Sequence, residues 1–291
     1  MITPRSLLRL TGGARAPDEA ARATAADAVL FDLDADATPP GRARARRTLR
    51  RRRDALAESG GLLLARVADA RSGELAADLD AAVWEATRAV VLASCETPQD
   101  ARDADVAIRR LEMRRGITPG QLRLLCEVDS ASGLAALPEV LQAVDRHQGV
   151  ALAPLALVGE LGATLPAGAP GGMHGASWAL LDHVMARAAL AAGGAGLPWL
   201  LDAPGASPAV RQTLVGRARD LGASGVVIAS EGEARGANAL FSPDPGRTED
   251  ARAVLSEWER VRAAGRWSGE VDGRRVDRRS ARRARREAGE S

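Results

Sequence analysis

Eight short apolar runs recur along the chain, and segments with helical character separate them. The runs are Ser6–Leu10, Ala28–Leu33, Leu62–Val67, Ala89–Leu92, Leu122–Val128, Val150–Leu155, Trp199–Asp202 and Gly225–Ala229. They are nearly continuous in apolar residues rather than alternating, which indicates strands buried on both faces, as in parallel sheets. Eight such strands alternating with helices predict an α/β protein with a (β/α)8 TIM-barrel fold.

The segments between the runs support this topology. The predicted helices are Arg42–Leu56, Gly73–Arg88, Pro98–Arg115, Ala135–His147, Ser177–Ala192 and Ser207–Leu221. Several open with Pro or Ser near the first turn, as helices commonly do. A doubly wound open sheet is the alternative fold. No GxGxxG or P-loop pattern follows any run, which argues against a nucleotide-binding version of that sheet.

The residues after the eighth run lie beyond a complete barrel. We therefore expect residues 1–240 to form the barrel and residues 241–291 to form a C-terminal extension. That extension should contain a helix at Thr248–Ala264, a Gly-rich hairpin at Gly265–Asp277 and a basic, helix-prone tail at Arg278–Arg286. We expect this helical appendage to pack on the barrel or on a neighbouring subunit.

Composition limits the chemistry and the compartment. Of the 291 residues, 46% are hydrophobic, which is enough for a sizeable core. All forty basic residues are Arg, and a chain without Lys cannot be a Schiff-base aldolase. Cys95 and Cys126 are too few for a disulfide framework or a metal finger, and both lie in apolar runs. Buried free thiols, with no signal peptide and no membrane-spanning run, predict a cytoplasmic protein.

The fifth run ends in one acidic residue, Glu127, and small polar residues follow it. In parallel α/β folds the carboxyl ends of the strands are where sites are built, so Glu127 is a candidate site residue. The alternative is a strand that ends in a charged residue on reaching solvent.

A series of short motifs resembles one enzyme family along almost the whole chain. In order they are RSLLRL (5–10), DAVLFDLDAD (27–36), LLLARV (62–67), VVLASCETPQD (90–100), LLCEVDSASGL (124–134), AAGGAGLP (191–198), LGASGVVIASEG (221–232), FSPDPGRTEDAR (241–252) and VDGRRVD (271–277). Together they resemble the HpcH/HpaI aldolase and citrate lyase beta-subunit family, on the side that includes malyl-CoA lyases. The resemblance implies a TIM barrel that cleaves or forms a carbon–carbon bond beside a thioester or keto acid, often as a trimer.

The resemblance also implies roles for four residues. Arg66 stands where the family has an Arg that helps to hold the substrate, and Glu127 stands where it has the first carboxylate ligand of a magnesium ion. Asp32 and Asp34 match the acidic signature of the second strand, and they would order metal-bound waters or position Arg66. Mg²⁺ takes hard oxygen ligands and stabilises a developing enolate, so carboxylates suit this chemistry.

Several family positions carry other residues in this chain. They are Ala35 for the last Asp of the second-strand signature, Ala68 for an Asn, Ala93–Ser94 for Pro-Lys, Ala153 for a Gly, Ala156 for the second metal-binding Asp, and Ala229–Ser230 for His-Pro. Because the number of carboxylates sets much of the affinity for Mg²⁺, we expect magnesium binding to be weak or lost. Asp129 or Glu160 could supply the missing carboxylate.

Two function hypotheses therefore stand side by side. The first is a citrate lyase beta-like carbon–carbon lyase or aldolase that acts on an acyl-CoA or keto acid with a weakened magnesium site. The second is a catalytically inactive family member that serves as a binding or assembly protein. Under both hypotheses, the resemblance to a family whose members often form trimers predicts a homotrimer or a higher oligomer.

The histidines offer weaker candidates. His147 is expected to end a helix and contact its dipole, and His183 is expected to pack or lie at the surface within a helix. His174 lies in a Gly-rich loop. It is either a functional residue on a lid or an ordinary loop residue, and the sequence leaves both interpretations open.

Two Arg-rich segments, Arg42–Arg53 and Arg278–Arg286, are first read as solvated helix faces. The sharper alternatives are that the first contacts the phosphates of CoA, or that both contact nucleic acid. No aromatic stacking platform lies near either segment in the sequence, so nucleic acid is not an expected partner.

Overall fold

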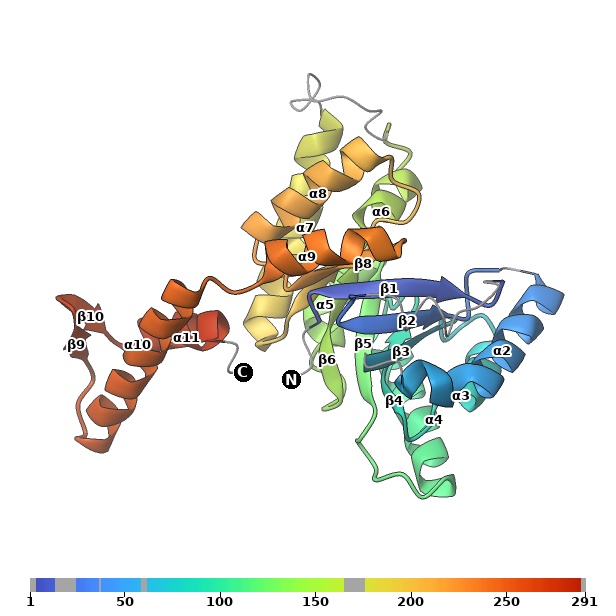
Figure 1. Ribbon diagram of the computed structural model, residues 1–291, viewed down its shortest axis with the longest axis horizontal. Coiled ribbons are helices and arrows are strands. Elements are labelled where there is room, and N and C mark those ends of the chain that lie inside the picture. Colours follow the sequence, from blue (N-terminus) through green and yellow to red (C-terminus); the bar gives the residue numbers. More distant parts are fainter. Residues whose placement is uncertain (1–3, 14–24, 37, 59–61, 165–175, 289–291) are drawn as a thin grey trace. The chain divides into compact units, whose positions relative to one another are not determined.

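The computed structural model describes residues 4–13, 25–36, 38–58, 62–164 and 176–288, and these form two compact units (Figure 1). The first ends at Phe241, and the second begins at Ser242. Each unit has its own apolar core, so each is described by itself.

The first unit is a closed barrel of eight parallel strands. The strands are β1 (Ser6–Thr11), β2 (Ala28–Asp32), β3 (Leu62–Val67), β4 (Thr87–Leu92), β5 (Arg123–Val128), β6 (His147–Leu152), β7 (Trp199–Leu201) and β8 (Gly225–Ile228). Each strand pairs with the next, and β1 also pairs with β8, which closes the ring. The TIM-barrel prediction is confirmed, and the open-sheet alternative is wrong.

The strand residues alternate between two cores. Inward-facing residues such as Leu30, Leu64 and Val91 form a small cluster inside the barrel. Outward-facing residues such as Phe31 and Val67 belong to the larger core that the surrounding helices cover. Burial on both faces explains why the strands are apolar throughout rather than alternating in the sequence.

Helices follow most of the strands. They are α2 (Pro39–Glu58), α3 (Leu75–Ala82), α4 (Pro98–Arg114), α5 (Ala131–Val140), α6 (Pro154–Glu160), α7 (Ala176–Ala195), α8 (Pro208–Asp220), the short 3₁₀ helix η2 (Glu231–Glu233) and α9 (Ala234–Phe241). Thr97, Ser130 and Ser207 cap three of these helices by accepting hydrogen bonds from backbone N–H groups of the first turn. The predicted helix Gly73–Arg88 is too long, because its last residues begin β4.

The sixth predicted strand and the helix before it are displaced. The strand is His147–Leu152 rather than Val150–Leu155, because Pro154 begins α6. His147 therefore starts a strand instead of ending a helix. It is buried, and its Nε2 lies 2.9 Å from the carbonyl oxygen of Val140, the last residue of α5. Burial lowers the pKa of the His147 imidazole, which favours its neutral form.

The second unit contains α10 (Pro245–Ala263), the antiparallel strands β9 (Gly269–Val271) and β10 (Arg274–Val276), and α11 (Arg278–Ala288). The predicted helix, hairpin and basic tail helix are thus confirmed. Ala251 and Leu255 of α10 pack against Ala281 and Ala284 of α11. What this unit packs on, and the predicted trimer, stay predictions. Among the described residues no helix combines the length and the apolar character needed to span a membrane.

The outer core supplies the first testable prediction. Phe31 is fully buried between the barrel wall and the helices. We expect Phe31→Ala to lower the free energy of unfolding by about 3–5 kcal/mol, because the substitution removes buried apolar surface and leaves a cavity. Urea denaturation measures the loss. Leu190→Ala is the control, since that side chain is 76% exposed on α7 and should change stability by less than about 0.5 kcal/mol. Equal losses in the two variants would contradict the packing described here.

Candidate active site

Five charged residues follow the inward-facing core residues at the carboxyl ends of the strands. Each lies two residues beyond an inward-facing apolar residue, so the alternation of the strand turns it toward the barrel axis. They are Arg9 of β1, Asp32 of β2, Arg66 of β3, Glu127 of β5 and Asp202 after β7. The same alternation assigns Ala93, Ala153 and Ala229 to the corresponding positions after β4, β6 and β8. The mouth of the barrel is therefore a ring of charges interrupted by three alanines.

The centre of this ring is the ion pair between Arg66 and Glu127. Arg66 Nε donates to Glu127 Oε2 at 2.5 Å, and Arg66 Nη2 donates to Glu127 Oε1 at 3.3 Å. Arg66 Nη1 donates to Asp34 Oδ2 at 2.9 Å and to Asp32 Oδ1 at 3.3 Å. Every guanidinium nitrogen is engaged, and Glu127 is only 3% exposed. The structure brings the four predicted site residues together at one end of the barrel.

Sequence reasoning missed the other half of the network. Arg9 Nε lies 3.3 Å from Asp32 Oδ2, and Arg9 Nη2 donates to Asp202 Oδ2. Asp202 ends the seventh apolar run, and Glu127 lies one residue before the end of the fifth, so a similar signal was present in the sequence. Arg9 carried a signal too, because it interrupts an apolar strand at an inward-facing position.

The acidic second-strand signature also anchors a helix to the barrel mouth. Asp34 Oδ1 pairs with Arg42 of α2 at 2.5 Å, and Arg42 reaches Asp78 of α3 at 4.0 Å. Arg46 of α2 also pairs with Asp78, and Arg50 pairs with Asp80. The predicted solvated face is confirmed in part. Most arginines of the segment are exposed, whereas Arg42 and Arg46 are half-buried and pair with acids. Several of its cations bind acidic side chains of the barrel, which leaves fewer of them for the phosphates of CoA.

Burial gives Glu127 an unusual ionisation. The pKa of its carboxyl is raised to about 7, mainly because burial disfavours the charged form, and the nearby Asp202 and Asp129 add to the rise. Arg66 opposes this shift but does not cancel it. Burial also raises the pKa of Asp202 and of Asp129. A carboxyl that titrates near neutral pH can both donate and accept a proton, as a general acid–base group must.

The carboxylates near the mouth already accept hydrogen bonds from other groups of the protein, which leaves fewer of their oxygens free to bind a magnesium ion. Both oxygens of Glu127 accept hydrogen bonds from Arg66. Asp129 Oδ2 accepts from Ser94 Oγ at 2.7 Å, and Glu160 Oε2 accepts from the backbone N–H of Ala131 at 2.9 Å. Ala156 lies exposed on α6 and offers no oxygen ligand from its side chain. Within the described ranges no three His, Cys, Asp or Glu side chains gather as a metal site. As arranged, this donor set does not fit Mg²⁺.

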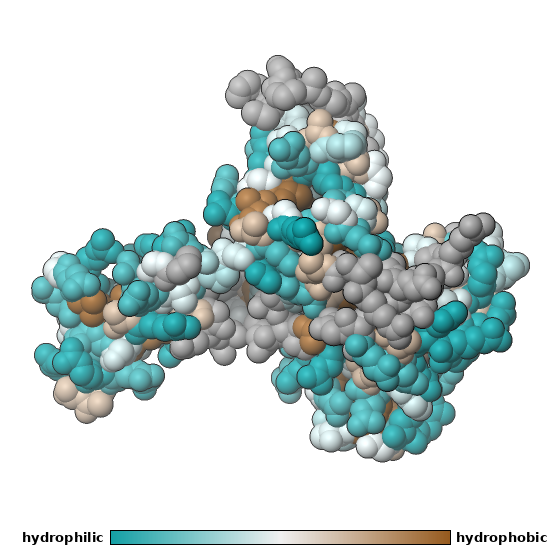
Figure 2. Space-filling view, viewed as in Figure 1, coloured by the Kyte–Doolittle hydropathy of each residue, from teal (hydrophilic) through white to brown (hydrophobic). Residues whose placement is uncertain are grey.

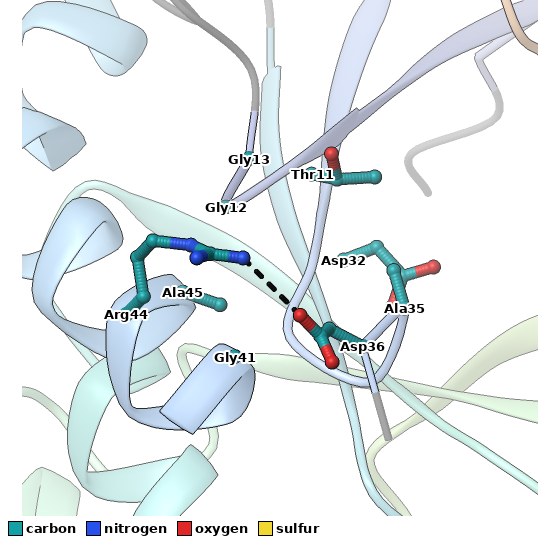
Figure 3. A pocket seen from close by; sticks show the side chains of 9 residues that line it. All are labelled: Thr11, Gly12, Gly13, Asp32, Ala35, Asp36, Gly41, Arg44 and Ala45. Carbon is teal, nitrogen blue, oxygen red and sulfur yellow. Dashed lines mark hydrogen bonds and ion pairs between the residues drawn. The ribbon is translucent and has the colours of Figure 1, made fainter. Parts of the chain in front are cut away.

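A small cavity borders the ring at the ends of β1 and β2 (Figure 3). It encloses about 150 Å³ and is lined by the Gly12–Gly13 turn, Asp32, Ala35 and the first turns of α2. Arg44 of α2 reaches across it to Asp36, with 3.2 Å between Nη2 and Oδ2. A Cβ on Gly12 would lie 2.4 Å from the Cα of Ala45, so glycine is required for α2 to approach this closely.

The remaining candidates that the structure describes contribute nothing to the ring. Cys95 and Cys126 are buried free thiols, as predicted, and Cys126 Sγ lies 3.6 Å from Nδ1 of His147. His183 lies at the surface of α7. His174 lies outside the described residues.

The model of the HpcH/HpaI aldolase/citrate lyase family matches residues 5–197, which is about two thirds of the chain. The chain belongs to this family. The matched segment contains the strands that carry Arg9, Asp32, Arg66 and Glu127. No curated protein sequence matches the chain.

Solved structures with the same fold are remote in sequence. CitE from Mycobacterium tuberculosis, in complex with magnesium, acetoacetate and coenzyme A, has a TM-score of 0.64 at 21% identity, covering 98% of this chain and 97% of CitE. A citrate lyase from Burkholderia xenovorans LB400 has a TM-score of 0.71 at 13% identity, covering 99% and 91%. Haloferax volcanii malate synthase, in a pyruvate/acetyl-CoA ternary complex, has a TM-score of 0.69 at 16% identity, covering 98% and 90%. Likeness at this identity establishes the shared fold.

The raised pKa of Glu127 predicts how stability depends on pH. Its pKa of about 7 in the folded state lies above the ordinary 4.5, so the folded state binds more protons between these values. The stability contributed by this group is therefore lost as pH rises through 7. We expect Glu127→Gln to gain about 2 kcal/mol relative to wild type between about pH 5 and pH 8.

Urea unfolding of both proteins at a series of pH values measures this difference. Asp103→Asn is the control, because Asp103 lies on α4, away from the network, with its carboxylate accepting from Gln99 on the same helix. A difference between Glu127→Gln and wild type that stays constant across this pH range would show that Glu127 ionises normally.

Proposed function

We propose that the barrel mouth cleaves or forms a carbon–carbon bond in a keto acid or an acyl-CoA, and that its magnesium site is weakened or lost. The observation that carries this proposal is the buried Arg66–Glu127 pair at the carboxyl ends of β3 and β5, with the pKa of Glu127 raised to about 7. The family of the chain supports the reaction class.

Arg66 suits a substrate carboxylate, since a guanidinium presents paired donors that match the two oxygens of such a group. In the free protein Glu127 and Asp34 occupy those donors. Protonation of Glu127 weakens its hold on Arg66, and an incoming carboxylate then restores the lost negative charge. Substrate binding and protonation of Glu127 thus favour each other.

Glu127 also suits the proton transfers of aldol cleavage. A base removes the proton of the substrate hydroxyl, the carbon–carbon bond breaks, and its electron pair forms an enolate that must take up a proton. A carboxyl with a pKa near 7 can act in either direction at neutral pH. Arg66 and Arg9 lie at the mouth as the cations able to stabilise the negative charge of the enolate.

The likeness to other structures guides the choice of ligands. CitE from Mycobacterium tuberculosis binds acetoacetate and coenzyme A, and the malate synthase from Haloferax volcanii binds pyruvate and acetyl-CoA. We propose that this chain binds a compound of the same class, a short keto acid with or without a CoA thioester.

A second candidate function is binding without catalysis. The residues that favour it are Ser94, Ala156 and Ala229, which stand where the family carries a Lys, an Asp and a His. If these changes abolish turnover, the mouth remains a carboxylate-binding site and the protein acts through what it binds.

The lyase proposal predicts the effect of changing Arg66. We expect Arg66→Gln to lower kcat/KM for cleavage by about 100-fold or more, which is about 2.7 kcal/mol, because the carboxylate and the enolate lose their cation. Arg66→Lys should recover only part of the activity, since an ammonium cannot bind bidentately. Arg109→Gln on α4 is the matched control and should leave kcat/KM unchanged, because Arg109 is exposed and pairs with Asp105 of its own helix.

The assay measures the keto product from a panel of hydroxyacyl-CoA thioesters and hydroxy keto acids, with circular dichroism to confirm folding. If wild type binds a keto acid and turns over none of the panel, the second candidate function replaces the first. Full activity of Arg66→Gln would refute both, because both need this cation.

The proposal of a weakened metal site predicts that restoring one carboxylate strengthens the binding of Mg²⁺. We expect Ala156→Asp to strengthen Mg²⁺ binding by about tenfold or more, roughly 1.4 kcal/mol, because a second carboxylate adds attraction to the divalent ion. Ala156→Asn is the matched control, since it has nearly the same shape without the charge. Calorimetric titration of Mg²⁺ into each variant measures the effect. Tight wild-type binding that survives Glu127→Gln would place the metal elsewhere.

A further inference from the structure

A basic groove lies within the second unit, between the end of α10 and α11. It encloses about 730 Å³ and is open to solvent. Two tryptophans line it, Trp258 and Trp267. Five arginines line it as well, namely Arg262, Arg266, Arg278, Arg282 and Arg285. Figure 2 shows that the exposed surface around these two helices is largely hydrophilic.

Helix geometry explains why these side chains converge. Ala281, Ala284 and Ala288 face α10 in the core of the unit. Arg278, Arg282 and Arg285 recur at spacings of four and three, so they form one stripe along α11 beside that apolar face. Trp258 and Arg262 form a matching stripe one turn apart on α10.

The arginines of the groove are uncompensated. None of the five forms an ion pair within the part of the chain that the structure describes, and no acidic residue lines the groove. Some other arginines of the same unit are paired. Arg247 and Arg283 pair with Glu287, and Arg260 pairs with Glu257. Arg252, Arg274 and Arg279 also form no ion pair within the described residues, but they lie outside the groove. The groove is distinguished by five unpaired arginines that line one surface together with two tryptophans.

The tryptophans give the groove flat apolar surfaces. Trp267 is 88% exposed, which is unusual for the largest apolar side chain. Trp258 packs partly against the core of the unit and lines the groove with the rest of its ring. The tail Arg278–Arg286 has no aromatic residue nearby in sequence, but folding places two tryptophans beside it. This overturns the reason for not expecting nucleic acid as a partner.

We propose that this groove binds single-stranded nucleic acid. The phosphates would contact the arginines, and unpaired bases would stack on Trp267 and Trp258. An acidic protein would satisfy the arginines and leave the exposed indoles without planar partners, so the combination favours bases. The proposal is independent of the activity at the barrel mouth.

The test uses the full chain and a fluorescein-labelled oligothymidylate of about fifteen nucleotides. Fluorescence anisotropy should show saturable binding, and log K should fall with log salt with a slope of about −2 to −3.5, as expected for roughly three to five neutralised phosphates. Arg278→Glu/Arg282→Glu should weaken binding at least about tenfold. Arg252→Glu/Arg279→Glu changes the charge of the second unit by the same amount at exposed positions outside the groove, and should weaken binding far less.

Heparin, a polyanion without bases, separates stacking from charge. Trp267→Ala should weaken oligothymidylate binding at least about fivefold and leave heparin binding unchanged, and Trp267→Phe should retain most of the affinity. Three results would overturn the proposal. They are no binding at about 50 mM salt, equal loss in the two charge-reversal variants, and loss of self-association in Trp267→Ala, which would show that a second copy covers the groove.

Discussion

One electrostatic constraint governs the mouth of the barrel. A charged side chain that is buried there, in surroundings of low dielectric constant, needs a partner of opposite charge. Arg66 meets this constraint by binding Glu127, Asp32 and Asp34 at once. Removing one partner from such a pair costs roughly 3–5 kcal/mol, since the remaining charge stays buried. Arg9 extends the network to Asp202, so side chains of β1, β2, β3 and β5 and the residue after β7 constrain one another. The same contacts that position the candidate catalytic groups thus tie the strands together at this end.

The fold was largely predictable because strands that are buried on both faces are apolar throughout, and such runs can be recognised in the sequence. Eight apolar runs mark eight strands, and the largest boundary error, at β6, arose because apolar residues continue past Leu152 into α6. Only the Pro at position 154 distinguishes the strand from the helix that follows it. Helix ends without a Pro or a hydroxyl cap, such as the end of α3, were equally hard to locate.

The candidate site was predictable in part, for a different reason. Arg66, Glu127, Asp32 and Asp34 match positions to which the resemblance assigns roles. Asp202 lies outside the family-like motifs, and Arg9 lies in one of them, RSLLRL, at a position to which no role was assigned. Their partnership joins residues 193 positions apart, and it follows only from closure of the barrel, which sets β1 and β7 on either side of β8. The raised pKa of Glu127 was beyond sequence reasoning for the same reason, since it depends on how many acids surround one buried carboxyl. Likewise, the tryptophans of the basic groove lie beside α11 only because α10 packs against it.

The excess of acids at the mouth adds to the raised pKa of Glu127. Asp32, Asp34, Glu127 and Asp202 face Arg9 and Arg66 inside the ring, with Arg42 drawn in from α2. A divalent cation would offset this excess, and so does a proton on one carboxyl. In the free protein Arg66 binds both oxygens of Glu127, and the carboxyl still keeps a pKa of about 7. The proton is retained on Glu127 although Arg66 donates to this carboxylate from two of its nitrogens, because burial and the neighbouring acids outweigh that one cation.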